Sequence, residues 1–198
     1  MTSTQKRKSQ TASGEADALG SLSKRRQTIQ QTMERLPNGT RRLAAQLRTP
    51  IKNSTIWEVL TDYERLNTFI PNLSSSELIS RKDNSVVLKQ VGTQKFVGVK
   101  FSAKVEIELI ENKSKGDIQF HLLKGDFRKF EGAWRIRNVP ETESTCLLYE
   151  LTVQGCIGMP VGLIEQRLRE DLSNNLLAVE NEATRREKEL LKSQIIES

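Results

Sequence analysis

The residues of this chain that could do chemistry are few, and their spacing disfavours catalysis. There is one histidine, His121. A single histidine excludes any mechanism that needs two histidines and most metal sites. Cys146 and Cys156 are too few for a disulfide framework or a four-thiolate zinc site, and we expect both to be inert small apolar residues. No nucleophile stands next to a base, and no glycine-rich phosphate loop is present. The sequence therefore predicts no catalytic residue, no metal ligand and no cofactor.

The charged residues of the strand-like segments alternate with the apolar ones, so they are expected on the outer face of a sheet, where they cannot act as acid–base catalysts on a buried ligand. Glu131 and Arg135 alternate with Trp134, and Glu150 lies next to Tyr149 in the chain, so we expect these three charges on a solvated face. His121 falls on the same kind of row and is expected to be exposed. Asp62 follows a helical pattern and is expected to make a local hydrogen bond near the end of that helix.

The body of the chain has the pattern of antiparallel strands. The clearest signal lies between Val97 and Leu109, where seven apolar residues alternate with small, polar or charged ones. Shorter runs predict further strands at Arg41–Arg48, Ser76–Arg81, Ser85–Val91, Ile118–Leu122, Phe130–Ile136 and Leu147–Val153. Such alternation predicts a sheet with one covered face and one face in water.

Two helices flank these strands. Ile56, Val59, Leu60 and Tyr63 recur at helical spacing before the sheet. After Pro160, an apolar stripe marks a long final helix, and its members are Val161, Ile164, Leu168, Leu172 and Leu176. The covered face of the sheet is the surface on which that stripe can be buried, so we expect a strongly bent sheet around the helix. A curved sheet and a straight helix do not fit flush, and an internal apolar cavity between them is expected to take a small apolar ligand.

The front of the chain differs in composition from the rest. Residues 1–48 hold ten basic and three acidic residues, a net charge of +7, while the remainder carries −1. We expect residues 1–39 to be a basic, largely disordered arm, with a short helix over Leu22–Leu36. The arm is interpreted as a solvated linker, as a contact for an anionic membrane surface or RNA, or as an organelle-targeting peptide. The domain is expected over residues 40–183, followed by a charged helical extension over 184–198, with the final helix leaving the body or fraying beyond Glu180.

Several of these segments together resemble a known superfamily. The first-helix pattern Ser54-x-x-Trp57-x-Val59-Leu60-x-Asp62-Tyr63-x-x-Leu66-x-x-Phe69-Ile70-Pro71 is similar to the START-related polyketide cyclase/dehydrase and lipid transport proteins, the Bet v 1-like or helix-grip group. Gly132-x-Trp134-Arg135-Ile136, Leu148-Tyr149-Glu150-Leu151 and Gly158-Met159-Pro160 resemble the last strands and the entry to the last helix. The resemblance implies an α+β helix-grip fold with about six or seven strands, and it is greatest to the coenzyme Q-binding and cyclase/dehydrase branch.

What the resemblance implies about function is the capture of a hydrophobic small molecule, such as a quinone, an isoprenoid or a lipid, by a carrier or chaperone. The residues expected to line the cavity are Trp57, Phe69, Phe101, Val105, Phe120, Phe130, Trp134, Tyr149, Ile164, Leu168 and Leu172. Two alternatives remain: an aromatase/cyclase-type enzyme, and a protein that contacts the ribosome or RNA through the basic arm. No signal peptide or membrane span is visible, so we expect a cytoplasmic protein, peripheral to a membrane in one interpretation, or an organellar one if the arm is a transit peptide.

Overall fold

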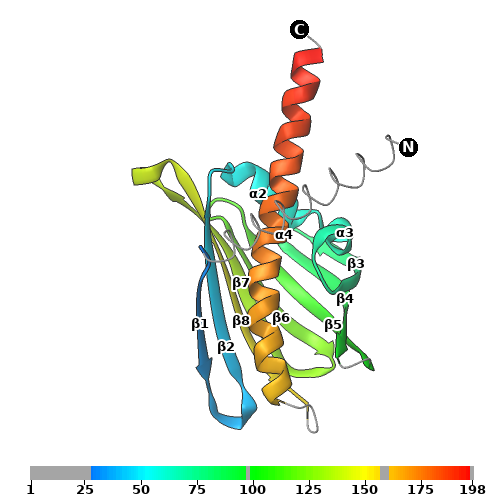
Figure 1. The fold of residues 1–198 in the computed structure, drawn as a ribbon. Coiled ribbons are helices and arrows are strands. Elements are labelled where there is room, and N and C mark those ends of the chain that lie inside the picture. Colours follow the sequence, from blue (N-terminus) through cyan, green and yellow to red (C-terminus); the bar gives the residue numbers. More distant parts are fainter. Residues whose placement is uncertain (1–27, 97–98, 157–160, 197–198) are drawn as a thin grey trace, which may run out of the picture.

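The computed structural model describes residues 28–96, 99–156 and 161–196, and in them one long helix lies across the concave face of a bent antiparallel sheet (Figure 1). The strands are β1 (Gln30–Arg35), β2 (Arg41–Thr49), β3 (Leu73–Lys82), β4 (Ser85–Phe96), β5 (Val99–Asn112), β6 (Asp117–Gly125), β7 (Phe127–Val139) and β8 (Ser144–Gly155). Their order in the sheet is β1-β2-β8-β7-β6-β5-β4-β3, and every neighbouring pair is antiparallel. The predicted helix-grip architecture is confirmed, with eight strands where six or seven were expected.

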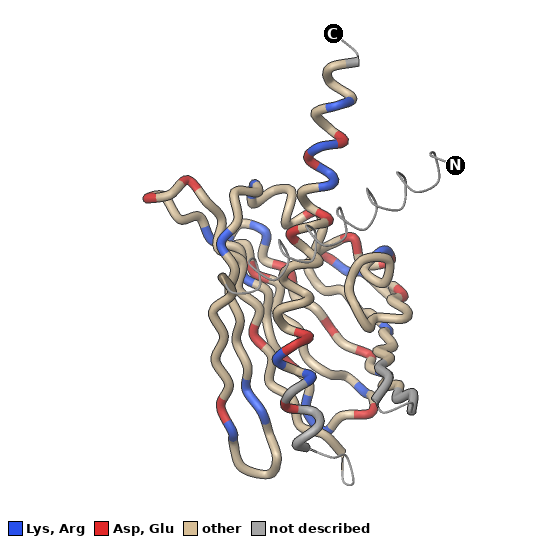
Figure 2. Tube along the Cα trace, viewed as in Figure 1, with Lys and Arg blue, Asp and Glu red and all other residues tan. Residues whose placement is uncertain are grey.

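The period-two patterns form the inner face of this sheet as predicted. On β5, the side chains of Val105, Ile107 and Leu109 are buried, while those between them face outward and are partly exposed. The outward row carries cross-strand ion pairs such as Glu106–Lys124 and Glu108–His121. Figure 2 shows acidic and basic residues interspersed along these strands. This arrangement is typical of a solvated sheet face, and His121 is exposed as expected.

The strand β1 corrects the expectation of a helix over Leu22–Leu36. Residues 30–35 pair with β2, with Met33 opposite Leu43, and Met33 packs against the core. A tight turn at Pro37–Gly39 joins the two strands, in which Asn38 and Gly39 adopt φ values of 58° and 74°. Because this turn is a hairpin connection, it directs the preceding residues back along β2 as a strand. The sheet therefore begins at Gln30, inside the segment predicted as an arm; residues 1–27 lie outside the described part of the chain.

Three α-helices complete the described part of the fold: α2 (Asn53–Thr61), α3 (Leu66–Phe69) and α4 (Val161–Ile196). The short helices α2 and α3 lie between β2 and β3, and α4 contacts both of them as well as β2 and β8. The expectation that α4 leaves the body after Glu180 is wrong by about two turns. Ala183 is fully buried, and Glu187 still accepts hydrogen bonds from the backbone N–H of Lys52 and the hydroxyl of Thr55.

Beyond Glu187 the helix α4 projects away from the sheet, as Figure 1 shows. Leu190, Leu191 and Ile195 are exposed on this projecting end. Among the described residues, no helix combines the length and the apolar character that a bilayer crossing requires.

Candidate functional site

Five aromatic side chains lie in contact along the inner face of the sheet, and we call them the aromatic wall: Phe120, Phe127, Phe130, Trp134 and Tyr149. They come from three adjacent strands, β6, β7 and β8. Ring centroids are 5.4 Å apart for Phe127 and Phe130, 5.6 Å for Phe120 and Phe130, and 6.3 Å for Phe120 and Tyr149. Trp134 stacks on Tyr149 with a centroid distance of 3.9 Å and rings parallel to within 1°.

The sequence builds this wall by placing a glycine where the rings need room. Gly132 on β7 is the direct partner of Phe120 on β6. A Cβ atom at residue 132 would lie 2.6 Å from Cζ of Phe120, and it would overlap the carbonyl oxygen of Glu150. Because glycine has no Cβ, the ring of Phe120 can lie over the β7 backbone and reach towards Tyr149.

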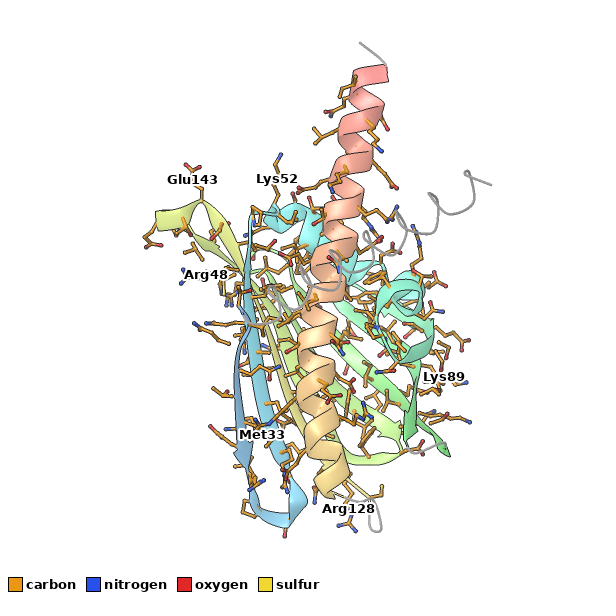
Figure 3. The ribbon with its side chains drawn as sticks, viewed as in Figure 1. Met33, Arg48, Lys52, Lys89, Arg128 and Glu143 are labelled. Atoms are coloured by element: carbon orange, nitrogen blue, oxygen red, sulfur yellow. The ribbon has the colours of Figure 1, made fainter. Side chains whose placement is uncertain are left out.

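A β-bulge brings Phe127 to the same face. Strict alternation along β7 would put Phe127 on the face opposite Phe130, because their numbers differ by three. The pairing of β7 with β8 shifts register between Phe127 and Lys129, which adds one residue and turns Phe127 inward. Arg128, its neighbour in the chain, lies at the end of the sheet where α4 begins (Figure 3).

In the described part of the chain, side chains under α4 are buried less completely near the start of the helix than further along it, and we call these two parts the open half and the closed half. In the closed half, the side chains of Leu172, Leu176, Val179 and Ala183 are at most 1% exposed. In the open half, Leu168 and three of the wall residues, Phe127, Phe130 and Trp134, remain only partly buried. Large aromatic side chains on a sheet face under a helix are normally buried. Because these rings are only partly buried, water reaches part of an apolar surface here.

Polar groups occur at the α4 side of the wall. Burial raises the pKa of the Tyr149 hydroxyl above its ordinary value of 10, and the negative charge of Asp171 on α4 raises it further. Tyr149 therefore stays neutral at physiological pH and can donate a hydrogen bond. Asp171 accepts a hydrogen bond of 3.0 Å from the side-chain amide of Asn72, which precedes β3. One helical turn along α4, the side-chain oxygen of Asn175 is buried without a hydrogen-bond partner.

Ion pairs join α4 to the body near its start and again beyond the closed half. Near its start, Glu165 is paired with Arg35 of β1 and Arg41 of β2, and hydrogen bonds from these two guanidinium groups lower the pKa of its carboxyl. Towards the other end, Arg186 donates a 2.6 Å hydrogen bond to Asp62. The local hydrogen bond expected for Asp62 is present, because its carbonyl oxygen accepts a 3.0 Å hydrogen bond from the backbone N–H of Arg65, and its carboxylate lies 3.8 Å from the Arg65 guanidinium. The contact with Arg186 adds a link to α4.

The charged residues predicted to face solvent lie on the outer row of the sheet. Arg135 donates a 2.7 Å hydrogen bond to Glu150, and it also pairs with Asp117. Glu131 pairs with Lys129. These groups lie on the face of β7 and β8 opposite to Trp134 and Tyr149, so they face away from the aromatic wall.

The structure brings together only part of the predicted site. Phe120, Phe130, Trp134 and Tyr149 form one contiguous cluster, with Leu168 at its open edge. The other described members pack in the core around this cluster: Trp57 on α2, Phe69 on α3, Val105 on β5 and Leu172 on α4. The side chains of Phe101 and Ile164 lie outside the described part of the structure. The role of all eleven in ligand binding stays a prediction.

Sequence reasoning missed Phe127 and Asn175. No period-two rule finds Phe127, because the bulge that turns it inward is a tertiary feature. For Asn175 a signal was available: it occupies an i, i+3, i+7 position between Leu172 and Val179 in the buried stripe of α4. An amide within an apolar stripe is uncommon, and this position could have been singled out from the sequence.

Comparisons with known proteins agree with this architecture. A family model described as polyketide cyclase / dehydrase and lipid transport matches residues 49–180. No curated relative matches the chain. Among solved structures, a STAR-related lipid transfer protein from Xanthomonas axonopodis has a TM-score of 0.65 at 16% identity, over 79% of this chain and 94% of its own.

Two further structures are similar in the same way. The Zhui aromatase/cyclase from Streptomyces sp. R1128 has a TM-score of 0.64 at 17% identity, over 74% of this chain and 95% of its own. A protein from Thermus thermophilus has a TM-score of 0.61 at 21% identity, over 72% of this chain and 97% of its own. At these identities the likeness shows the fold, because one fold hosts many functions.

Proposed function

This chain belongs to the polyketide cyclase / dehydrase and lipid transport family, and on that premise we propose that it binds a hydrophobic small molecule between the aromatic wall and α4, as a carrier. The ligand classes considered are quinones, isoprenoids and lipids. One observation carries the proposal: three rings of the wall, Phe127, Phe130 and Trp134, remain partly exposed on the sheet face that α4 crosses.

The physical driving force is burial of the remaining apolar surface. Each Å² of apolar surface removed from water contributes about 25 cal/mol, so about 300 Å² of isoprenoid chain contributes about 7.5 kcal/mol before the costs of association. Flat aromatic faces such as those of Phe130 and Trp134 pack well against planar or polyene ligands. Because α4 is fixed by Glu165 at one end and Arg186 at the other, the site is held in place before the ligand arrives.

The arrangement of charges supports a carrier over an enzyme. An aromatase/cyclase-type mechanism needs an acid and a base aimed at the ligand. The Arg135–Glu150 pair, whose two partners lie beside wall residues in the chain, faces the outer side of the sheet. At the wall itself, Tyr149 has a raised pKa and acts as a hydrogen-bond donor at physiological pH rather than as a base, and the carboxylate of Asp171, whose charge acts on Tyr149, already accepts a hydrogen bond from Asn72. The RNA and membrane alternatives rest on residues 1–39, most of which lie outside the described residues, and they stay predictions.

The test is a binding measurement with a matched pair of variants. We would titrate the full chain with decylubiquinone, farnesol and oleate by isothermal calorimetry, and confirm stoichiometry by native mass spectrometry. Leu168→Trp puts a large ring over the open half of the wall. Leu190→Trp makes the same substitution on the same helix, but on its projecting end, where Leu190 is 57% exposed.

We expect the wild type and Leu190→Trp to bind at least one probe at 1:1 stoichiometry, and Leu168→Trp to bind it at least tenfold more weakly. Circular dichroism and urea denaturation show whether both variants keep the fold. The proposal is wrong if the wild type binds none of the three probes, or if both variants bind them equally well while folded.

A further inference from the structure

Asn175, a partly buried residue of α4, has a buried side-chain oxygen whose hydrogen-bonding capacity is not used. Among the described side chains that are not exposed, Oδ1 of Asn175 is the buried nitrogen or oxygen atom without a hydrogen-bond partner. A buried acceptor left unpaired costs about 1–3 kcal/mol, and native proteins rarely keep one without a reason. A leucine at this position would remove that cost. We therefore expect the hydrogen-bond donor for this oxygen to come from a bound molecule.

Asn175 lies within the span of the closed half, on the helix face that continues to Leu168 in the open half. It lies between Leu172 and Val179 in the buried stripe, and seven residues after Leu168, which is partly exposed at the edge of the wall. In an α-helix, residues spaced by three, four and seven share one face. The amide therefore faces the body of the protein from the helix that crosses the aromatic wall.

Two other polar groups lie about one helical turn nearer the start of α4. Asp171 is four residues before Asn175, about 6 Å along the helix axis, and its charge acts on the hydroxyl of Tyr149 at the wall. Asn72 is held to Asp171 by a hydrogen bond. Asn175 thus lies next to the polar end of an otherwise apolar surface.

We propose that the ligand of this site is a mainly apolar molecule with a hydroxyl group, and that this hydroxyl donates a hydrogen bond to Oδ1 of Asn175. This inference rests on the proposed function and narrows it. An unpaired carbonyl oxygen needs a donor. A quinone offers only carbonyl acceptors and a hydrocarbon offers nothing, whereas an isoprenoid alcohol, a hydroxylated lipid or a quinol offers an O–H.

The experiment compares farnesol with farnesyl methyl ether, in which a methyl group replaces the hydroxyl hydrogen and so removes the donor. Both are titrated by isothermal calorimetry into the full-length wild type, Asn175→Leu and Asn181→Leu. The second variant is the matched control, because Asn181 lies on the same helix and is exposed. Leucine branches at the same carbon as asparagine and removes the acceptor.

We expect the wild type and Asn181→Leu to bind farnesol about tenfold more tightly than its ether. In Asn175→Leu this preference falls to within about twofold, while affinity for the ether is retained and the midpoint of urea denaturation is not lowered. The retained ether binding shows that the apolar site is intact.

The outcomes separate the two proposals. If the wild type binds alcohol and ether equally well, or if Asn175→Leu keeps the preference, the role of Asn175 is refuted and the binding function stands. If neither farnesol nor its ether binds to the wild type while decylubiquinone or oleate does, the hydroxyl proposal alone fails. If none of the four binds, the proposed function fails as well.

Discussion

Replacing Gly132 by alanine tests how the aromatic wall is built. The added Cβ would lie 2.6 Å from Cζ of Phe120 and would overlap the carbonyl oxygen of Glu150. The ring of Phe120 can move by rotation about its side-chain bonds, but the carbonyl belongs to the paired strand β8 and moves only with the backbone. Overpacking of a core typically costs about 1–3 kcal/mol, and more where backbone must shift. Alanine gains about 0.5–1 kcal/mol over glycine inside a strand, which offsets only part of this cost.

We therefore expect Gly132→Ala to lower the free energy of unfolding by about 2–4 kcal/mol. The assay is urea denaturation followed by tryptophan fluorescence, with the slope of the transition checked so that a midpoint shift can be read as stability. The matched control is Gly92→Ala in β4. A Cβ at residue 92 would have as its nearest neighbours the carbonyl oxygens of Asn72 at 3.8 Å and Ala103 at 3.9 Å, which is ordinary van der Waals contact.

Gly92→Ala should be neutral or slightly stabilising, by up to about 1 kcal/mol. Adding Phe120→Leu to Gly132→Ala removes the ring contact but leaves the contact with the carbonyl of Glu150, so stability should recover only in part. Equal midpoints for Gly132→Ala and Gly92→Ala would refute this account of the wall. Complete recovery in the double variant would show that the ring, and not the backbone, is the obstacle.

Two further predictions concern titration. The chain has two tyrosines, Tyr63 and Tyr149, and burial raises the pKa of both above 10, with a hydrogen bond to Glu111 adding to the shift of Tyr63. Absorbance of tyrosinate near 295 nm should therefore stay flat through pH 10–11 in the native chain and rise for both residues together on unfolding. Since the folded pKa values are raised, the stability that the tyrosines contribute is fully present below pH 10 and falls above it. Titration of either tyrosine near pH 10 in the native chain would contradict its burial. Hydrogen bonds from Arg185 and then Arg186 lower the pKa of Glu182 to about 2, so its contribution, at most about 3 kcal/mol, is present above pH 4.5 and lost as pH falls towards 2. Glu182→Gln should flatten the acid side of a stability–pH curve measured by urea denaturation, and an unchanged curve would show that these ion pairs contribute nothing.

The inner face of the sheet was predictable because, once one face is buried, period-two alternation determines which face each side chain of a strand occupies. Val105, Ile107 and Leu109 follow that rule without exception. The same rule fails at Phe127, because a bulge inserts one residue and reverses the facing of everything before it. The strand β1 was missed for another reason: it is an edge strand of mostly polar residues, and only its pairing with β2 makes it a strand.

The polar part of the site was less accessible to sequence reasoning than its apolar part. Periodicity identifies which side chains face the core, but not which of them are left partly uncovered by α4. The partial exposure of Phe130 and Trp134 depends on where a straight helix diverges from a curved sheet, which is a property of the whole fold. The unpaired state of Asn175 likewise depends on every neighbour of its amide, and a sequence pattern alone does not give those neighbours.

The distribution of contacts along α4 explains how an open apolar surface can persist in a stable protein. In the closed half, Leu172, Leu176 and Val179 are almost completely buried, and this burial stabilises the position of the helix on the sheet. The ion pairs of Glu165 fix the other end without covering the wall, because Arg35 and Arg41 reach the helix from β1 and β2 and not from β7. Packing therefore need not be complete over Phe127 and Phe130 for the helix to stay where it is. A ligand that completes this packing gains the free energy of burial without having to move the helix, which is the condition for a preformed binding site.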